Sequence, residues 1–286
     1  MSSIISLLSA SQFSSLTTSQ ITALKPADFA ALGTTQAPGL TTAQVGSVTS
    51  QDVVSISAAA IAALQSAVLS DLAADLTAAQ LSTSAVGTLT TAGTLSSVAT
   101  KTIAALSTTQ VSSLGTAQLA ALSTSQTQSI SATDLQAIST TTLAAVGTTV
   151  LPKLSSTQIA ALTSSQVAAV GADLSTGQVG SLTASQLSTA VVSALTTAGT
   201  LSSVATKTIA GLSTTQASSL GTAQLGALST SQVQAISGTD LDAISTATIG
   251  NLSTSVLAIL TYNQVSSLTS AQVGALSTTQ IQFLTV

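Results

Sequence analysis

Residues 106–126 read LSTTQVSSLGTAQLAALSTSQ, and this stretch contains the pattern that most of the chain follows. A large aliphatic residue opens a unit of eight residues, and Ser, Thr or Gly stands at position 2. Position 5 is usually Gln, position 6 is again aliphatic, and positions 7 and 8 are small. We call this unit the octad. Its repetition over nearly the whole chain predicts a repeat protein.

The spacing of the aliphatic residues fits neither common secondary structure. They do not alternate strictly with polar residues, as the residues of a half-buried strand do. In one continuous helix, eight residues would turn the apolar face by about 80° per octad, so the face would spiral around the helix. The pattern therefore predicts that the chain changes direction once in every octad.

A helix that starts at position 2 explains the spacing. Ser107 is then the N-cap and Gln110 is N3, which together form a capping box whose side chains each satisfy a free backbone N–H. Leu106 and Val111 become the hydrophobic staple on either side of that box. Each octad is expected to form a helix of about one and a half turns followed by a bend.

Helices this short are not stable alone, because nucleation is costly. We therefore expect an all-α solenoid of very short capped helices, with positions 1 and 6 filling an aliphatic interior. A β-solenoid with polar, Thr-rich corners is the alternative, since Thr and Val favour strands while Ala and Gln favour helices.

Exceptions to the octad fit the same phase. Pro26 falls at N1, where its missing N–H has no cost. The prolines at position 7 predict that a helix ends there; they are Pro38 and Pro152. Several aspartates take position 5, near a helix N-terminus; they are Asp28, Asp52, Asp134 and Asp240. Several glycines take position 2 and are expected to be N-caps; they are Gly33, Gly115, Gly147 and Gly221.

A longer repeat lies above the octad. Residues 89–110 recur almost unchanged as residues 195–216, and LAADLTAAQLST from Leu72 matches VGADLSTGQVGS from Val170. These longer units break the octad rhythm, so they are expected to form corners or bulges. The repetition divides one continuous solenoid, without a separate globular domain, into blocks at 1–88, 89–194 and 195–286.

Composition excludes several classes of function. Charged residues make up 4% of the chain and aromatic residues 1%, against about 25% charged residues in an ordinary globular domain. Eight acidic and four basic residues give a net charge of −4, so nucleic-acid binding is not expected. The chain has no His, Cys or Glu, so the usual catalytic and metal-binding constellations cannot form. We predict no enzyme activity, no catalytic residue, no metal site and no cofactor.

The remaining polar candidates have plainer interpretations. The pairs Asp71 with Asp75 and Asp240 with Asp242 could contribute to a weak calcium site, but no calcium-binding loop motif surrounds them, and helix capping is the preferred interpretation. The four lysines are too sparse for a basic patch and are expected to be solvated; they are Lys25, Lys101, Lys153 and Lys207.

The aromatic residues occur singly. Phe13 and Phe29 occupy position 6 and are expected in the core, whereas Tyr262 and Phe283 lie off the apolar phase and are candidates for contact with a partner.

The two ends of the sequence follow the apolar pattern without polar capping repeats. The sequence already follows the pattern from Leu8, and the octad from Leu276 ends at Phe283, so both end coils are expected to expose apolar residues. With few charges to keep molecules apart, this predicts head-to-tail stacking of copies into a filament. The segment MSSIISLLSASQF lacks a positive leading region and a clean cleavage site, so no classical signal peptide is expected. No apolar run approaches the roughly 18 residues that a membrane span needs.

The motif [LIV]-[ST]-x-x-Q-[LIV]-x-x resembles the Leu-Thr-Thr-x-Gln repeat tracts of large, low-charge surface or secreted proteobacterial proteins described as adhesin-like. The resemblance implies an extracellular or cell-surface role and transfers no functional residue. The leading hypothesis is a structural protein that assembles with itself into an extracellular filament, surface layer or biofilm matrix. The alternative is an adhesin stalk or an ice- or polysaccharide-binding solenoid that uses rows of Ser and Thr. In either case the partners are other copies and surface or matrix components.

Overall fold

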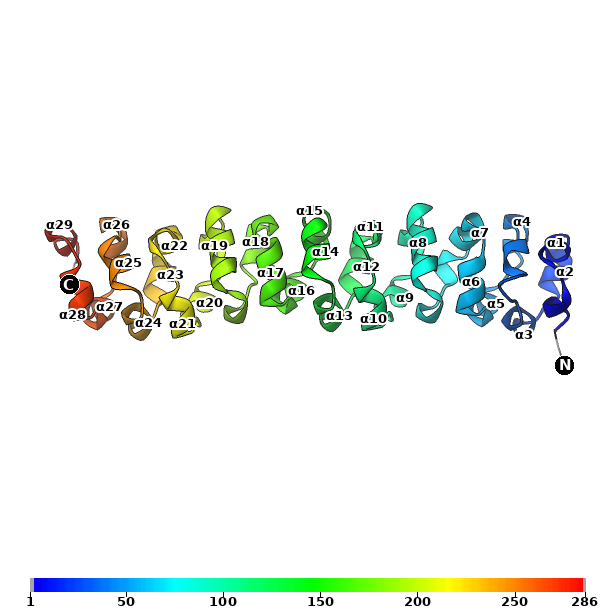
Figure 1. Cartoon of the computed structure of the whole chain (residues 1–286), viewed down its shortest axis with the longest axis horizontal. Helices are drawn as coiled ribbons and strands as arrows, with labels where there is room; N and C mark the ends of the chain where they lie inside the picture. Colours follow the sequence, from blue (N-terminus) through cyan, green and yellow to red (C-terminus); the bar gives the residue numbers. More distant parts are fainter. Residues whose placement is uncertain (1–2, 285–286) are drawn as a thin grey trace. The chain divides into compact units, whose positions relative to one another are not determined.

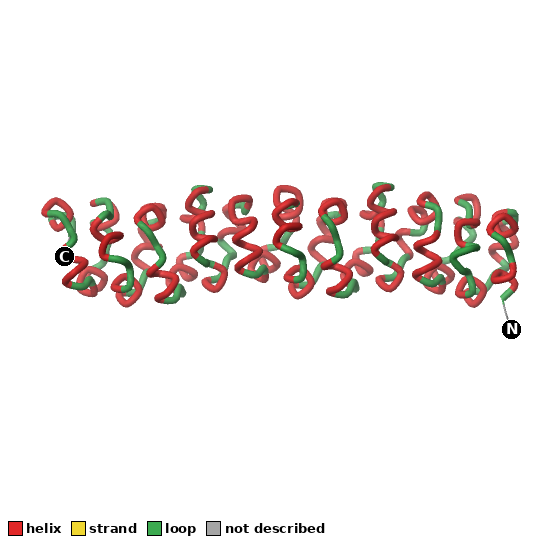
Figure 2. Tube along the Cα trace, viewed as in Figure 1, coloured by secondary structure: helices red, strands yellow, loops and turns green. Residues whose placement is uncertain are grey.

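The computed structural model describes residues 3–284. Helices joined by loops are the regular secondary structure of this part, which contains no strand (Figure 2). The predicted α-solenoid of short helices is confirmed, and the β-solenoid alternative is not supported. The chain divides into two compact units, Met1–Leu154 and Ser155–Val286. The three blocks inferred from sequence repetition do not coincide with these units and stay a prediction about repetition alone.

Unit 1 contains fifteen short α-helices and six 3₁₀ turns within its described part (Figure 1). The α-helices are α1 (Ala10–Ser14), α2 (Thr18–Thr22), α3 (Pro26–Ala30), α4 (Thr42–Val45), α5 (Ser50–Ser55), α6 (Ala58–Ala63), α7 (Ser66–Asp71), α8 (Thr83–Thr91), α9 (Thr100–Ala104), α10 (Thr108–Ser112), α11 (Thr116–Ala121), α12 (Thr124–Ser129), α13 (Ala132–Gln136), α14 (Thr140–Ala145) and α15 (Gly147–Val150). The 3₁₀ turns are η1 (Ile4–Leu7), η2 (Ala37–Gly39), η3 (Ala73–Asp75), η4 (Ala78–Gln80), η5 (Leu95–Ser97) and η6 (Leu151–Lys153).

Unit 2 has the same construction over residues 155–284. Its α-helices are α16 (Ser156–Ala161), α17 (Ser164–Val170), α18 (Thr176–Val179), α19 (Thr189–Thr197), α20 (Thr206–Ala210), α21 (Thr214–Ser218), α22 (Thr222–Ala227), α23 (Thr230–Ala235), α24 (Gly238–Asp242), α25 (Thr246–Gly250), α26 (Thr254–Leu257), α27 (Tyr262–Ser267), α28 (Ser270–Gly274) and α29 (Thr278–Ile281). Its 3₁₀ turns are η7 (Gly171–Asp173), η8 (Ala184–Gln186) and η9 (Leu201–Ser203).

The octad folds as its sequence predicts. In α10 the Ser107 hydroxyl accepts the N–H of Gln110 at 3.3 Å, and the Ser107 N–H donates to Oε1 of Gln110 at 2.9 Å. The staple residues Leu106 and Val111 are both buried. The capping box and the staple are therefore confirmed in the octad from Leu106 to Ser113.

Extended residues redirect the chain between many successive helices. Between α11 and α12, Leu122 has φ −64° and ψ 139°, and Ser123 has φ −67° and ψ 165°. Leu122 ends one helix, and Ser123 caps the next through the capping box with Gln126. With bends of this kind between them, the helices of residues 3–284 that are built from a single octad do not exceed seven residues.

Three octads make one coil of the solenoid. Helix α10 packs against α13, which starts 24 residues later, and α24 packs against α27 at the same separation. The side chains at positions 1 and 6 fill the interior, where Phe13 and Phe29 are completely buried as expected. Successive coils stack in this way within each unit (Figure 1).

The longer units form longer helices and 3₁₀ turns. The nine-residue helix α8 ends at a Schellman motif, in which Thr94 N–H donates to the Leu89 carbonyl at 2.9 Å and Gly93 N–H donates to the Thr90 carbonyl at 3.0 Å. Gly93 has φ 72°, and Gly199 after α19 has φ 71°, a conformation that glycine adopts at low cost. The equivalent Asp75 and Asp173 end the turns η3 and η7.

The helix ends that were predicted at the position-7 prolines, Pro38 and Pro152, do not lie at these residues. Pro26 is the first residue of α3, as expected. The α-helix before Pro152 does end, at Val150, but Pro152 lies inside η6, and Pro38 lies inside η2 with no α-helix directly before it. The chain keeps turning past both residues because the first N–H groups of a 3₁₀ turn need no partner within the turn.

The glycine predictions are partly wrong. Gly115 and Gly221 are N-caps of α11 and α22, as expected. Gly147 is instead the first residue of α15, and Val146 is its N-cap. Gly33 opens a turn that leads into η2, and no assigned helix starts directly after it.

Gly39→Ala is expected to destabilise unit 1. A Cβ at this position would overlap the carbonyl oxygen of Ala10 on the neighbouring coil and lie 2.8 Å from its carbonyl carbon. Overpacking of this kind costs about 1–3 kcal/mol. Gly46→Ala is the matched control, because its Cβ would meet nothing within 4 Å. Urea unfolding followed by circular dichroism should show a lower midpoint only for Gly39→Ala; equal midpoints would contradict this packing.

Candidate functional site

The glutamine at position 5 joins one coil to the coil before it. Oε1 of Gln126 accepts the N–H of Ser123 at 2.8 Å and so completes the capping box of α12. Nε2 of the same side chain donates to the carbonyls of Val98 at 2.7 Å and Leu95 at 3.1 Å, on the preceding coil. Val98 follows the last residue of η5, so no further turn of that helix supplies a donor to its carbonyl, whereas the Leu95 carbonyl also accepts the Val98 N–H at 3.2 Å. One amide therefore satisfies a helix start and a helix end on different coils.

The same arrangement recurs in both units. Further buried glutamines among residues 3–284 donate Nε2 to a position-1 carbonyl of an earlier coil at 2.6–2.9 Å; they include Gln44, Gln80, Gln186, Gln232, Gln264 and Gln272. The sequence pattern predicts that Oε1 of this glutamine accepts a hydrogen bond in the capping box. The hydrogen bond that Nε2 donates to an earlier coil was not predicted. The signal was available: glutamate also forms capping boxes, yet the chain contains none. Glutamate lacks the N–H donors that the preceding coil requires.

Other donors take the place of glutamine where the sequence departs from the octad. Thr102 and Thr208 stand at position 5 and donate their hydroxyls to the Leu76 and Leu182 carbonyls at 2.8 and 2.9 Å. In the octad from Val146 to Lys153, position 5 is valine. There the Lys153 ammonium donates to the Leu122 carbonyl at 2.6 Å.

Lys153 therefore corrects the expectation that all four lysines are solvated. Its ammonium also donates to the Ala120 carbonyl at 2.9 Å, and the side chain is half-buried between coils. The other three lysines are exposed, as expected. The hydrogen-bonding requirement of the Leu122 carbonyl explains why a cation reaches into the stack at this octad.

Two of the position-5 aspartates, Asp28 and Asp134, reverse the direction of the contact between coils. The Ser3 hydroxyl donates to Oδ1 of Asp28 at 2.7 Å, and the Thr108 hydroxyl donates to Oδ1 of Asp134 at 2.6 Å. The hydrogen bond from the Lys25 backbone N–H, followed by that from Ser3, lowers the pKa of Asp28 below its ordinary value of 3.8. A carboxylate cannot donate, so the earlier coil supplies the hydrogen.

The aspartate pairs considered for calcium hold other partners. Asp75 accepts the Ser50 hydroxyl at 2.7 Å, and Asp240 accepts the Ser237 hydroxyl at 2.6 Å in its own helix start. Within residues 3–284 no group of three or more His, Cys, Asp or Glu residues could hold a metal ion. Asp71 and Asp242 are exposed. This geometry lends the calcium hypothesis no support.

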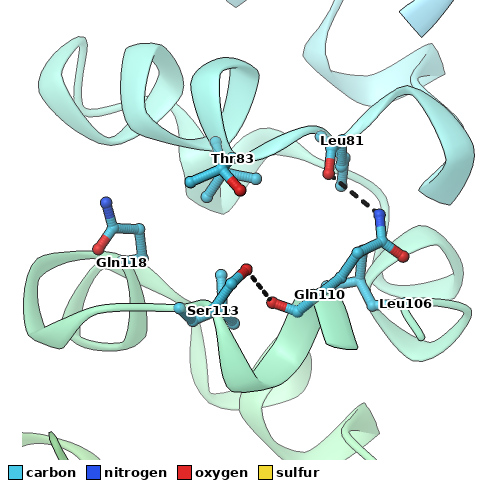
Figure 3. A pocket seen from close by; sticks show the side chains of 8 residues that line it. Leu81, Thr83, Leu106, Gln110, Ser113 and Gln118 are labelled. Atoms are coloured by element: carbon cyan, nitrogen blue, oxygen red, sulfur yellow. Dashed lines mark hydrogen bonds between the residues drawn. The ribbon is translucent and has the colours of Figure 1, made fainter. Parts of the chain in front are cut away.

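A small cavity between α8, α10 and α11 is too small for an organic ligand (Figure 3). Its volume is about 20 Å³, and its lining includes Leu81, Gln110, Ser113 and Gln118. That space is enough for about one water molecule. Gln110 still reaches across to donate to the Leu81 carbonyl at 3.0 Å.

The first and last coils expose aliphatic and aromatic side chains. The first coil comprises η1, α1 and α2, and on it Ile4 and Leu7 are 65% and 77% exposed. The last coil comprises α27, α28 and α29, and on it Ile281 and Phe283 are 48% and 44% exposed. Tyr262, also on the last coil, is 66% exposed. Tyr262 and Phe283 are thus accessible, and their contact with a partner stays a prediction.

No protein-family model matches this chain, and no curated protein matches it either. None of the helices between residues 3 and 284 is both long and apolar enough to cross a membrane.

Gln126→Glu is expected to destabilise the chain strongly. Glutamate keeps an oxygen that can accept the Ser123 N–H, but it lacks the two N–H donors and places a buried charge against the Leu95 and Val98 carbonyls. The expected cost is about 2–4 kcal/mol of unfolding free energy.

Gln12→Glu is the matched control for that prediction. Gln12 forms the same capping box with Ser9, but it is exposed on the first coil. The expected change is below about 0.5 kcal/mol. Urea unfolding of dilute protein measures the free energy of unfolding of both variants. Similar losses in the two would show that the hydrogen bonds donated to the preceding coil do not contribute to stability.

Lys153→Met is expected to cost about 1–3 kcal/mol, because two carbonyls lose a charged donor between coils. Lys101→Met removes an exposed lysine and should change stability by less than about 0.5 kcal/mol. Thermal unfolding of the two variants compares them directly. A Lys153 variant as stable as the Lys101 variant would contradict the assigned role.

Proposed function

We propose that this chain is a structural protein whose copies stack head to tail into an extracellular filament, surface layer or matrix. The observation that supports it best is the apolar exposure of the first and last coils. On the coil before the last, the position-6 residues Ile249 and Leu257 are at most 1% exposed, because the last coil covers them. Their counterparts on the last coil, Val273 and Ile281, are 39% and 48% exposed.

Burial of such residues would favour association. Exposed apolar groups that cluster on one surface mark interaction sites more often than scattered ones do. The chain also carries few charges, 4% of its residues and a net charge of −4, so repulsion between copies is weak. A contact between two unlike faces generates an open fibre unless the rotation closes a ring.

The proposed extracellular location rests on the resemblance of the octad to the repeat tracts of bacterial surface and secreted proteins. Matrix or cell-surface components are the further partners that this location would bring.

The alternative function is an adhesin stalk or an ice- or polysaccharide-binding surface. One feature favours it: a shallow hollow on unit 1 whose lining residues, Ser66, Ser84, Gly87, Thr88, Thr91 and Ala92, are mostly Ser and Thr. Thermal hysteresis and glycan-binding assays on monomeric protein distinguish this function from assembly. Activity in either assay without fibre formation would favour the alternative.

Purified protein is expected to form fibres that electron microscopy and sedimentation velocity detect. Changing Ile4 and Leu7 together to Ser should weaken assembly, because the two side chains would no longer be buried against another copy. Val54→Ser is the control, since Val54 is 54% exposed on an interior coil. Dispersed monomers of the unmodified chain at every concentration would contradict the proposed function.

A further inference from the structure

Each coil has two chemically different faces. The position-5 amides donate toward the preceding coil, and the position-1 carbonyls accept from the following coil. Gln272 illustrates the pairing: its Nε2 donates to the Ile244 carbonyl at 2.8 Å. Gln280 repeats it with the Leu252 carbonyl, also at 2.8 Å. Stacking of coils is therefore directional.

The first coil presents the donor face. Gln12 and Gln20 complete their capping boxes, with Oε1 accepting the N–H groups of Ser9 and Thr17 at 2.8 Å. Within residues 3–284 their Nε2 groups have no acceptor. Both side chains are exposed, whereas the equivalent Gln272 is 1% exposed.

The last coil presents the acceptor face. Leu268 and Leu276 stand at position 1, as Ile244 and Leu252 do one coil earlier. In the part of the chain that the structure describes, no donor reaches the carbonyls of Leu268 or Leu276. The exposed position-6 residues Val273 and Ile281 lie in the same octads as these carbonyls.

The two faces match in spacing. Gln12 and Gln20 are eight residues apart, and so are Leu268 and Leu276. Within the chain the donor and acceptor are 28 residues apart for Gln44 with Leu16, for Gln126 with Val98 and for Gln272 with Ile244; all three pairs lie in the same phase of the octad. A second copy placed on the last coil in this phase brings both donors to both acceptors.

We infer that the Nε2 groups of Gln12 and Gln20 in one copy donate to the Leu268 and Leu276 carbonyls of a second copy. The inference rests on the proposed self-assembly and names the contact that sets its register. The occupant is a second copy because the free donors and free acceptors are those that pair between adjacent coils of this same chain. The apolar residues of the two coils are buried alongside these hydrogen bonds.

The test is the double variant Gln12→Glu with Gln20→Glu. Glutamate keeps an oxygen for the N–H groups of Ser9 and Thr17, so each helix start is preserved. It cannot donate, and it places two negative charges against carbonyl oxygens of the other copy. The critical concentration for assembly, measured by sedimentation, is expected to rise at least tenfold.

The control is Ser11→Glu with Thr18→Glu, which adds the same charge to exposed positions in the first turns of α1 and α2. Its critical concentration is expected to stay within twofold of the unmodified chain. Circular dichroism melting of dilute protein should be unchanged in both variants, which separates loss of assembly from loss of folding.

Three outcomes decide between the claims. Assembly lost only in the glutamine variant supports the contact. Assembly equal in the two variants contradicts the contact and leaves the proposed function standing. An unmodified chain that never assembles contradicts both.

Discussion

The side-chain amide at position 5 is the interaction on which the rest of the structure depends. A chain that restarts its helix every eight residues leaves free N–H groups and free carbonyls at every bend. Isolated helices of this length do not form in water. Gln126 resolves both difficulties, since its oxygen caps Ser123 and its nitrogen bonds the Leu95 and Val98 carbonyls of the preceding coil. The octad is therefore stable only as a member of a stack.

This chemistry explains why so little charge is needed. Within residues 3–284, every buried side-chain nitrogen or oxygen atom has a hydrogen-bond partner. Neutral hydroxyls and amides make nearly all of those bonds, and their desolvation costs less than that of ions. Where the glutamine is missing, Thr102, Thr208 and Lys153 donate in its place, so the requirement of the carbonyl persists although the residue type changes.

The local half of the structure could be predicted from the sequence, and the half that depends on distant residues could not. Ser107 and Gln110 lie three residues apart, so their capping box follows from spacing alone. The pairing of Gln126 with Val98 depends on three octads completing one coil, which no local pattern encodes. Lys153 was misjudged for the same reason, because its acceptor lies 31 residues away. Gly93 could have been recognised as the residue just after a helix end, where glycine is common because it adopts positive φ at low cost.

Hydrogen exchange of the glutamine side-chain amides, resolved by NMR on monomeric protein, tests the central claim most directly. If position-5 amides hold the coils together, the NH₂ protons of Gln126, Gln232 and Gln272 should exchange far more slowly than those of Gln12 and Gln20. All five side chains form capping boxes through Oε1, so only the contact of Nε2 with the preceding coil distinguishes the two groups. Slow exchange confined to the first group is the predicted result, and equal exchange in all five would contradict the account.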